Sequence, residues 1–293
     1  MVQYAVLMAD VKNSRSYRSV ARDNLQILLS ESISYLNEIF SESLIKKVMF
    51  SAGDEVQGLF HDAVSACLYY RMLYLLMGPD VLRGGIGLGG WSVFLEEEGS
   101  TGQDGEAYHR ARAAIDRAKT NKHFDLVFRS GGAYDDALTI LLDHSLGICK
   151  MRTAAQNETA LVVELMRPIV LDGGDFRFLE KGVSTKELFI RGLDVLRRKS
   201  FCSQRQASKL IEGVLRAGEG GMASLWRPVG LREFVCDSEW PILSGKDLTG
   251  ISYDLANVAG VSRQGLDRKI SQGRIVQERS AIVAFACIAR RFL

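Results

Sequence analysis

The chain has 293 residues, of which 47% are hydrophobic and 25% are charged, and its formal net charge at pH 7 is +2. This length allows one or two domains with hydrophobic cores of their own. No run approaches the ~20 apolar residues that a membrane-spanning helix needs, so we expect no membrane partner. We expect no secretory signal, because the apolar run over residues 4–8 is short and meets Asp10.

The five cysteines are scattered, with no CxxC pair and no histidine at metal-ligand spacing. Zinc sites and disulfides are therefore not indicated, and a cytoplasmic location is expected. The charge is uneven. Residues 246–293 hold eight Lys and Arg and four Asp and Glu, a net +4, so the rest of the chain carries −2. A basic tail on a mildly acidic body suggests two roles, one of them contact with nucleic acid.

The first segment reads as a buried strand that ends in an acid. Tyr4–Ala9 is a continuous apolar run, the pattern of a strand buried on both faces. Asp10 stops it and is expected at its C-terminal end, either as a site residue or as a simple strand-end cap. A polar loop follows over Lys12–Ser16, and apolar residues at helical spacing predict a helix over Ser19–Phe40.

The next segment predicts a β-hairpin with an acidic tip. Two short apolar runs, Val48–Ser51 and Val56–Phe60, flank a turn that contains Gly53, Asp54 and Glu55. A turn needs at most one Asp or Asn for its backbone geometry. The second acid makes a cation site worth considering, and a solvated hairpin tip is the alternative.

Asp62–Met77 predicts a helix that is apolar nearly all round, with Asp62 as its N-cap and Gly78-Pro79 as its stop. Burial in the core is the favoured interpretation. The alternative, a self-association face, makes a homodimer plausible.

Val81–Gly90 predicts a strand in which glycines alternate with Ile86 and Leu88. Glycine weakens a strand, so this density implies close approach by another backbone or a ligand. The remaining elements predicted for this half are an extension of that strand over Trp91–Leu95, a loop over Glu96–Gly105, a helix over Glu106–Lys119, a strand over Phe124–Phe128 and a helix over Ala137–Leu146.

The order of elements predicts an α+β fold of the ferredoxin-like type, since strand, helix, strand, strand, helix, strand is a split βαβ pattern. In that topology the first and third strands are antiparallel neighbours at the sheet centre. Asp10 is then expected close to Asp54 and Glu55 at one edge of the sheet.

Carboxylates that converge in this way are suited to Mg²⁺ or Mn²⁺, which prefer oxygen ligands and are commonly shared with substrate phosphates. The small-residue loop offers backbone N–H groups and cations to phosphate oxygens. Its candidate nucleotide-binding residues are Lys12, Asn13, Ser14 and Arg15. Further candidates are Arg83, His109, Arg110 and Arg112, with a solvated helix face as the alternative for the last two and a structural role for His109. The glycines at 84–90 lie within a strand, which excludes a dinucleotide-binding GxGxxG loop.

Beyond about residue 150 the pattern weakens. Helices are predicted over Ala154–Met166, Ser184–Arg198 and Gln204–Arg216. The segments 171–178 and 218–221 look like linkers because they carry glycine doublets without periodicity. No fold is predicted for residues 167–245.

The C-terminal segment predicts a helix-turn-helix. A short helix over Ser252–Ala259, a turn at Gly260-Val261 and a second helix over Ser262–Gln272 have the spacing of that motif. The expected exposed face of the second helix, which would contact DNA, is made of Ser262, Arg263, Gln264, Asp267, Arg268 and Lys269.

Taken together, these motifs resemble the SatD family of bacterial proteins, which place a helix-turn-helix at the C-terminus. The resemblance covers roughly residues 3–145 and 250–275. The motifs that carry it are Ala9-Asp10-Val11-(x)-Asn13-Ser14, Gly53-Asp54-Glu55-(x)-Gln57-Gly58-Leu59, Arg83-(x₂)-Ile86-Gly87-(x)-Gly89 and Asp104-Gly105-(x)-Ala107-Tyr108-(x₂)-Ala111-Arg112.

More distantly, the first domain resembles the palm of class III nucleotide cyclases and diguanylate cyclases, and residues 52–56 are similar to the GGDEF signature. The resemblance implies a palm-type metal site at Asp10 and Asp54, assisted by Glu55. The sequence departs from the cyclase pattern at two positions. His109 stands where cyclases carry an Asn, and Arg112 is one residue away from their Arg position.

The resulting domain prediction is a palm over residues 1–150, a helical region over 151–245 and a helix-turn-helix region over 246–293. The first functional hypothesis is a metal-dependent nucleotide cyclase or nucleotidyltransferase that acts on a nucleoside triphosphate, releases pyrophosphate and is coupled to DNA binding. The second is a transcription regulator whose palm binds a nucleotide without consuming it. The third is a protein that merely retains the fold.

Overall fold

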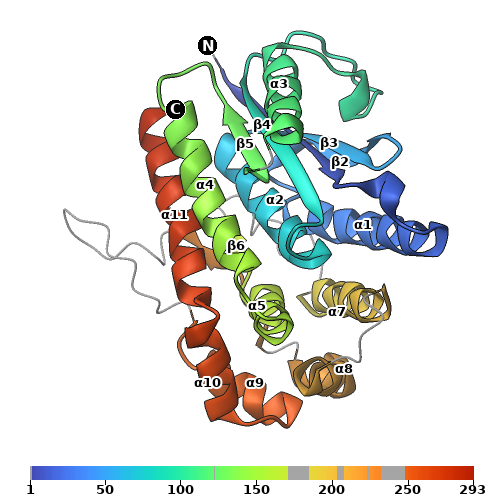
Figure 1. Cartoon of the computed structure of the whole chain (residues 1–293), viewed down its shortest axis with the longest axis vertical. Coiled ribbons are helices and arrows are strands. Elements are labelled where there is room, and N and C mark those ends of the chain that lie inside the picture. Colours follow the sequence, from blue (N-terminus) through green and yellow to red (C-terminus); the bar gives the residue numbers. More distant parts are fainter. Residues whose placement is uncertain (1, 122, 171–184, 203–207, 223–224, 232–247) are drawn as a thin grey trace.

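The computed structural model contains a five-stranded sheet with helices on both of its faces (Figure 1). The residues that it describes are 2–121, 123–170, 185–202, 208–222, 225–231 and 248–293. The α+β class expected from the sequence is therefore confirmed. None of the described helices combines the length and the apolar composition that crossing a membrane requires.

The strand order is β2-β3-β1-β4-β5. β1 pairs antiparallel with both β3 and β4, so the expected neighbours, the first and third strands, do lie side by side at the sheet centre. β5 extends the sheet by pairing parallel to β4. The strand bounds are Tyr4–Val11 for β1, Leu44–Ala52 for β2, Glu55–Phe60 for β3, Leu82–Gly89 for β4 and Leu126–Arg129 for β5.

One strand prediction was wrong. β4 ends at Gly89, and residues 91–95 do not extend it. In that stretch Val93 forms an isolated bridge to Asp104, and Trp91 packs edge-on against Tyr4 with its indole N–H on the carbonyl of Val93. Directly after β4, the carbonyl of Gly90 accepts the backbone N–H of Ala107 at the start of the next helix.

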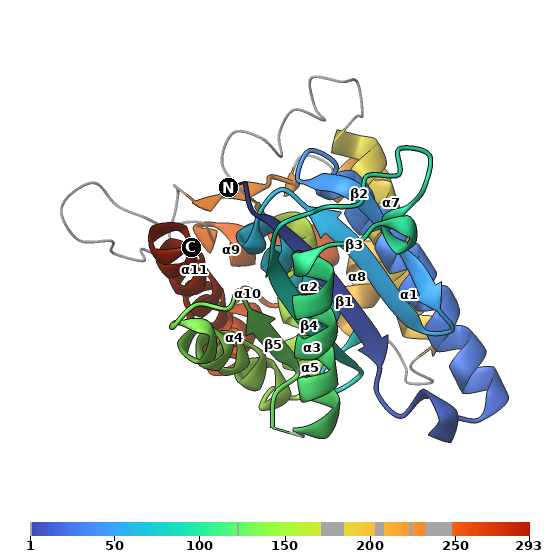
Figure 2. The same ribbon diagram turned by 90° about the horizontal axis from the view of Figure 1, so that it is seen from above.

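Residues of β1 alternate between two cores, as the period of a strand requires. Ala5, Leu7 and Ala9 belong to the large core under α1 (Ser19–Ile39) and α2 (Ala63–Met77). Val6 and Met8 belong to a smaller core under α3 (Glu106–Thr120), which lies across the opposite face (Figure 2). Asp10 continues the second series and therefore faces α3.

The glycines of β4 allow α3 to lie directly on the sheet. A Cβ added at Gly85 would stand 2.3 Å from the backbone nitrogen of Ile115, and one at Gly87 would stand 2.2 Å from that of Ala111. Real Cβ atoms essentially never approach so closely. The glycine-rich strand thus accommodates another backbone, which is one of the two explanations that the sequence offered.

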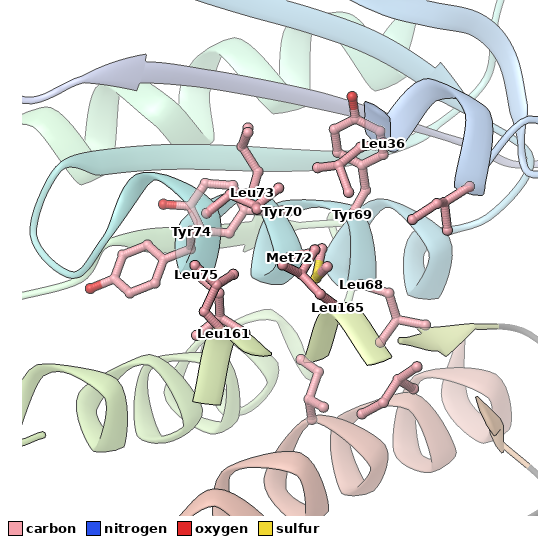
Figure 3. Packing of buried hydrophobic residues seen from close by; sticks show 14 of the residues in the cluster. Leu36, Leu68, Tyr69, Tyr70, Met72, Leu73, Tyr74, Leu75, Leu161 and Leu165 are labelled. Carbon is pink, nitrogen blue, oxygen red and sulfur yellow. The ribbon is translucent and has the colours of Figure 1, made fainter. Parts of the chain in front are cut away.

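α2 is a core helix, because every residue from Ala63 to Met77 is buried. Asp62 caps it by accepting the backbone N–H groups of Val64 and Ser65. Figure 3 shows its tyrosine and leucine side chains packed between the sheet side and Leu161 and Leu165 of α5. A helix buried on all sides offers no face for self-association, so the argument for a homodimer from this segment was wrong.

The other helices form a layer beyond α2, in which α11 runs alongside α4 (Figure 1). The glycines at 218–221 lie within α8, so the linker expected there was wrong, whereas 171–178 lie outside the described residues. The long helix α11 was not predicted. The bounds are Asp135–Lys150 for α4, Ala154–Met166 for α5, Thr185–Cys202 for α7, Lys209–Met222 for α8, Ile251–Ala259 for α9, Arg263–Gln272 for α10 and Ile275–Phe292 for α11, with a small parallel pair of strands formed by β6 (Ile169–Val170) and β7 (Val229–Gly230).

A buried ion network joins α2 to this helical layer. Arg71 of α2 contacts Glu164 of α5 at 2.7 Å and Glu278 of α11 at 2.6 Å, and each of these side chains is at most 3% exposed. Arg279 also binds Glu164, and Arg152 lies 3.8 Å from Glu278. Buried charges persist only when they are paired, so this network fixes how the helical layer sits on the sheet domain.

Candidate functional site

A polar cavity of about 530 Å³ opens where β1 ends. It combines carboxylates, cations and small polar side chains from β1, its following loop, the β2–β3 turn, β4 and α3. The residues that line it are Asp10, Val11, Asn13, Ser14, Ser16, Asp54, Arg83 and Lys119. Asp10 and Asp54 therefore face one cavity, as the predicted topology required.

Asp10 is nearly buried, at 8% exposure, and is held by two cations. Its cross-strand partner is Arg83, whose guanidinium donates to the carboxylate at 2.6 and 3.3 Å. Lys119, at the end of α3, places its ammonium 3.2 Å from the same carboxylate. The pairing explains how an acid is tolerated at the end of a buried strand. Both cations also line the cavity, so they can turn to a ligand.

Glu55 faces the cations rather than the cavity. The Arg112 guanidinium donates two hydrogen bonds to its carboxylate, at 2.7 and 2.8 Å, and the Lys119 ammonium lies 3.4 Å from the same carboxylate. Burial raises the pKa of Glu55, but the hydrogen bonds and charges of Arg112 and Lys119 outweigh it and lower the value. Glu55 thus stays ionised and is paired with Arg112 and Lys119, and the metal-assisting role expected for it stays a prediction.

The loop after β1 presents its small residues to the cavity. Asn13 adopts a left-handed conformation, with φ of 53°, and residues 14–16 form a single 3₁₀ turn. The Ser16 hydroxyl donates to the carbonyl of Asn13 at 2.7 Å. Lys12 does not line the cavity, because its ammonium binds Asp125. The side chain of Arg15 lies outside the described part of the structure.

Two predicted residues lie elsewhere on α3. His109 is ten residues before Lys119, which is about 15 Å along a helix axis. Its side chain is 76% exposed and lies 3.5 Å from Asp104. Arg110 donates to the carbonyl of Leu88 at 2.7 Å, also at the far end of β4. The structure therefore does not bring His109 or Arg110 to the cavity.

No role was predicted for Lys119 or Asp125, and Ser16 was indicated only as the last residue of the polar loop Lys12–Ser16. Lys119 ends the predicted third helix, and antiparallel packing of that helix on β4 would have placed it beside Arg83. Asp125 is 1% exposed and immediately precedes β5. An isolated Asp before an apolar run was the available signal for it.

The donor set fits a divalent cation that arrives with phosphate oxygens. Asp10 and Asp54 supply two carboxylates to one cavity, which matches the one or two that Mg²⁺ usually takes from protein when it also binds substrate phosphates. Within the described part of the chain, no group of three or more His, Cys, Asp or Glu is placed to hold a metal ion by itself. A cage built from protein ligands alone is therefore not indicated among these residues.

At the C-terminal end, α9 and α10 are joined by a tight turn at Gly260, whose φ is 65°. Ser262 caps α10 by accepting the backbone N–H of Gly265. Arg263, Gln264 and Arg268 are exposed. Arg263 lies 3.6 Å from Asp267, and Lys269 is partly buried. The predicted helix and turn positions are thus present, with a surface that mixes cations and one acid.

The model of the SatD family matches residues 4–130. The resemblance predicted from the sequence is thereby confirmed over this range, which contains every residue of the cavity. The match does not reach α9 and α10, so it leaves the helix-turn-helix part of the resemblance untested. A comparison with curated proteins gave no match.

Solved structures of a bacterial light-regulated adenylyl cyclase also align with the chain, at 16% and 17% identity and a TM-score of 0.29 in both cases. The alignments cover 43% of this chain and 42% and 75% of the solved chains. The first of these alignments therefore spans less than half of the cyclase chain. Similarity at this level carries no argument about the activity of the SatD-matched region.

Proposed function

We propose that the cavity of the SatD-matched region binds a nucleoside triphosphate together with Mg²⁺ or Mn²⁺. The observation that carries the proposal is the meeting of two carboxylates, Asp10 and Asp54, with two cations, Arg83 and Lys119, in one cavity of about 530 Å³. A ligand that matches both signs carries anionic oxygens and a divalent cation, and a metal-bound triphosphate is such a ligand.

The proposal assigns a binding role to each group of residues that lines the cavity. Asp10 and Asp54 hold the divalent ion, which when bound neutralises phosphate charge and orients the chain of phosphates. Arg83 and Lys119 donate to phosphate oxygens, and Asn13 and Ser14 offer backbone N–H groups, with the Ser14 hydroxyl, to the same oxygens. Glu55 keeps Lys119 in place through its ion pair.

Binding without consumption is the function that the geometry supports best. Of the cations and imidazoles expected to act in nucleotidyl transfer, His109 lies at the other end of α3 and Arg112 is engaged by Glu55. The second candidate is a cyclase or nucleotidyltransferase, which the paired carboxylates favour. In that reaction a ribose hydroxyl attacks the α-phosphorus, the bond to the bridging oxygen breaks, and pyrophosphate leaves as the hydroxyl loses its proton.

Isothermal titration with ATP, GTP, CTP and UTP, each with MgCl₂ or MnCl₂, tests the binding proposal. Pyrophosphate release and chromatography of the nucleotide in the same samples test the second candidate. We expect one nucleotide to bind, with loss of binding in Asp54→Ala and no loss in the matched control Asp23→Ala, an exposed acid on α1. No binding of any triphosphate would overturn the proposal.

We further propose that α10 binds DNA, through exposed Arg263, Gln264 and Arg268, with Ser262 and Lys269 beside them. Its support is the net charge of the tail, +4 over residues 246–293, together with the exposure of Arg263, Gln264 and Arg268. A library of random-sequence duplexes is the probe, with affinity measured against salt. Arg263→Ala and Arg268→Ala should each lower the salt slope by about 1. The control Arg117→Ala removes an exposed arginine from α3 and should leave it unchanged.

A further inference from the structure

Asp125 is the hub of a buried polar cluster beside the cavity. It immediately precedes β5 and is 1% exposed. Its carboxylate binds the ammonium of Lys12 and accepts contacts from Lys150 at 2.9 Å and from the Tyr74 hydroxyl at 2.8 Å. Its carbonyl accepts the Tyr70 hydroxyl at 2.8 Å. The cluster thus joins the loop after β1 to α2, β5 and the last residue of α4.

The two lysines are what make this buried carboxylate tolerable, since an ionised acid away from water needs paired charges. Burial opposes the charge on Lys150, but the hydrogen bond and charge of Asp125 outweigh it and raise the pKa of that ammonium. Asp80 lies 3.5 Å from each ammonium but is mostly exposed, so it is the weaker partner.

Lys12 is held through both its backbone and its side chain. Its backbone N–H donates to the carbonyl of Val81 at 2.8 Å, and its side chain reaches Asp125. The next residue, Asn13, takes the left-handed conformation that starts the turn over Ser14–Ser16. Asn13, Ser14 and Ser16 line the cavity and Lys12 does not. The Lys12–Asp125 ion pair, which we call the anchor, therefore lies next to the cavity lining without being part of it.

We propose that Lys12 is a positioning residue whose ion pair with Asp125 fixes the cavity loop, residues 13–16, for phosphate binding without touching the phosphates. The inference rests on the proposed nucleotide function. It differs from the expectation that Lys12 itself contacts the ligand. If Lys12 only orients the loop, its removal changes ligand affinity through the conformation of residues 13–16 and not through a lost contact to the ligand.

The first experiment needs no ligand and so is independent of the proposed function. Hydrogen exchange of the free protein reports on the amides of Ser16 and Tyr17, which donate to Asn13 and Ser14 within the loop. Lys12→Met should speed their exchange at least tenfold, while Lys12→Arg, which keeps the charge, should restore protection. Unchanged exchange in Lys12→Met, with its melting temperature also unchanged, would overturn the proposal.

The second experiment separates the two roles by titration of the MgCl₂ complexes of the four triphosphates. Partners that orient a binding group cost about 10- to 100-fold when removed. Lys12→Met and Asp125→Asn should each weaken binding by at least tenfold, and the double variant should be no weaker than either single one. If Asp125→Asn, which frees Lys12, bound as tightly as the wild type or more tightly while Lys12→Met bound weakly, Lys12 would be a direct phosphate ligand and the proposal would fail.

These outcomes are distinguishable from failure of the proposed function. If the wild-type chain binds no triphosphate, the proposed nucleotide site is refuted. The hydrogen-exchange experiment still tests whether the Lys12–Asp125 ion pair fixes the cavity loop. If Asp125→Asn does not fold, Lys12→Met and Lys12→Arg decide the question alone. They do so because Lys12 is partly exposed, at 20%, and its removal leaves Asp125 paired with Lys150.

Discussion

Asp10→Asn should abolish the metal dependence of nucleotide binding. In the free protein the Asp10 carboxylate is paired with the Arg83 guanidinium, through contacts of 2.6 and 3.3 Å, and with the Lys119 ammonium at 3.2 Å. A metal ion bound by this carboxylate would release both cations to the phosphates. The amide that replaces the carboxylate carries no charge, so the variant should lose the metal effect and leave Arg83 and Lys119 free from the start.

The magnitude follows from the contacts that are released. A hydrogen bond between charged groups contributes about 1.5–3 kcal/mol, and 1.4 kcal/mol is about a factor of ten in affinity. Without metal, Asp10→Asn should therefore bind the triphosphate about tenfold more tightly than the wild type does. With MgCl₂ the wild type should tighten by at least this factor, whereas the variant should not change.

Isothermal titration in EDTA and in excess MgCl₂ measures all four affinities. Asp23→Asn, at an exposed position on α1, controls for the loss of one negative charge and should behave like the wild type. Thermal unfolding confirms that the variant is folded. Weaker metal-free binding by Asp10→Asn, or a persistent effect of magnesium on it, would refute the assignment of Asp10 as the residue that both holds the ion and restrains the cations.

Three further predictions concern the frame of the site. Gly87→Ala should lower the free energy of unfolding in urea by about 3 kcal/mol or more, because its Cβ would strike the α3 backbone, while the control Gly147→Ala, in open space within α4, should raise it by about 1 kcal/mol. Equal effects of the two would refute the close approach. Burial raises the pKa of Glu164, but Arg279 and Arg71 lower it to about 2. The stabilisation that the ionised Glu164 carboxylate gives to the fold is therefore complete above about pH 4.5 and is lost as the pH falls to about 2. This loss amounts to about 3 kcal/mol in the free energy of unfolding, and it should be absent in Glu164→Gln. Glu55→Gln should weaken triphosphate binding about tenfold, because Lys119 loses the partner that points it at the cavity, and unchanged affinity would contradict this orienting role.

Residue patterns and the order of elements were enough to predict the centre of the sheet and the positions of Asp10 and Asp54. Residues 4–9 read as a two-faced buried strand, and the alternation of glycines in β4 indicated close backbone approach. The order of elements then placed Asp10 beside the β2–β3 turn, and the cavity contains both Asp10 and Asp54. These features follow from chain connectivity and residue period, which a single sequence displays.

The partners of each charge were harder to predict, because they depend on which helix end meets which strand end. Glu55 was expected to assist the metal pair Asp10 and Asp54, and its pairing with Arg112 and Lys119 of α3 was not foreseen. Lys12 was expected to contact phosphate, but its ammonium is paired with Asp125, which lies 113 residues later in the sequence. Local spacing carries no record of such distant pairings, so the sequence predicts the acids of the site better than its cations.

The end of α4 brings the two proposed binding sites into one structural frame. Lys150 holds Asp125, which in turn holds the cavity loop through Lys12. Two residues later, Arg152 donates to the carbonyl of Gly273, the residue that follows α10, at 2.6 Å. We therefore expect a shift of the cavity loop on ligand binding to reach α10 through this short segment. If the sites are coupled in this way, linkage requires the nucleotide to change DNA affinity by the same factor by which DNA changes nucleotide affinity.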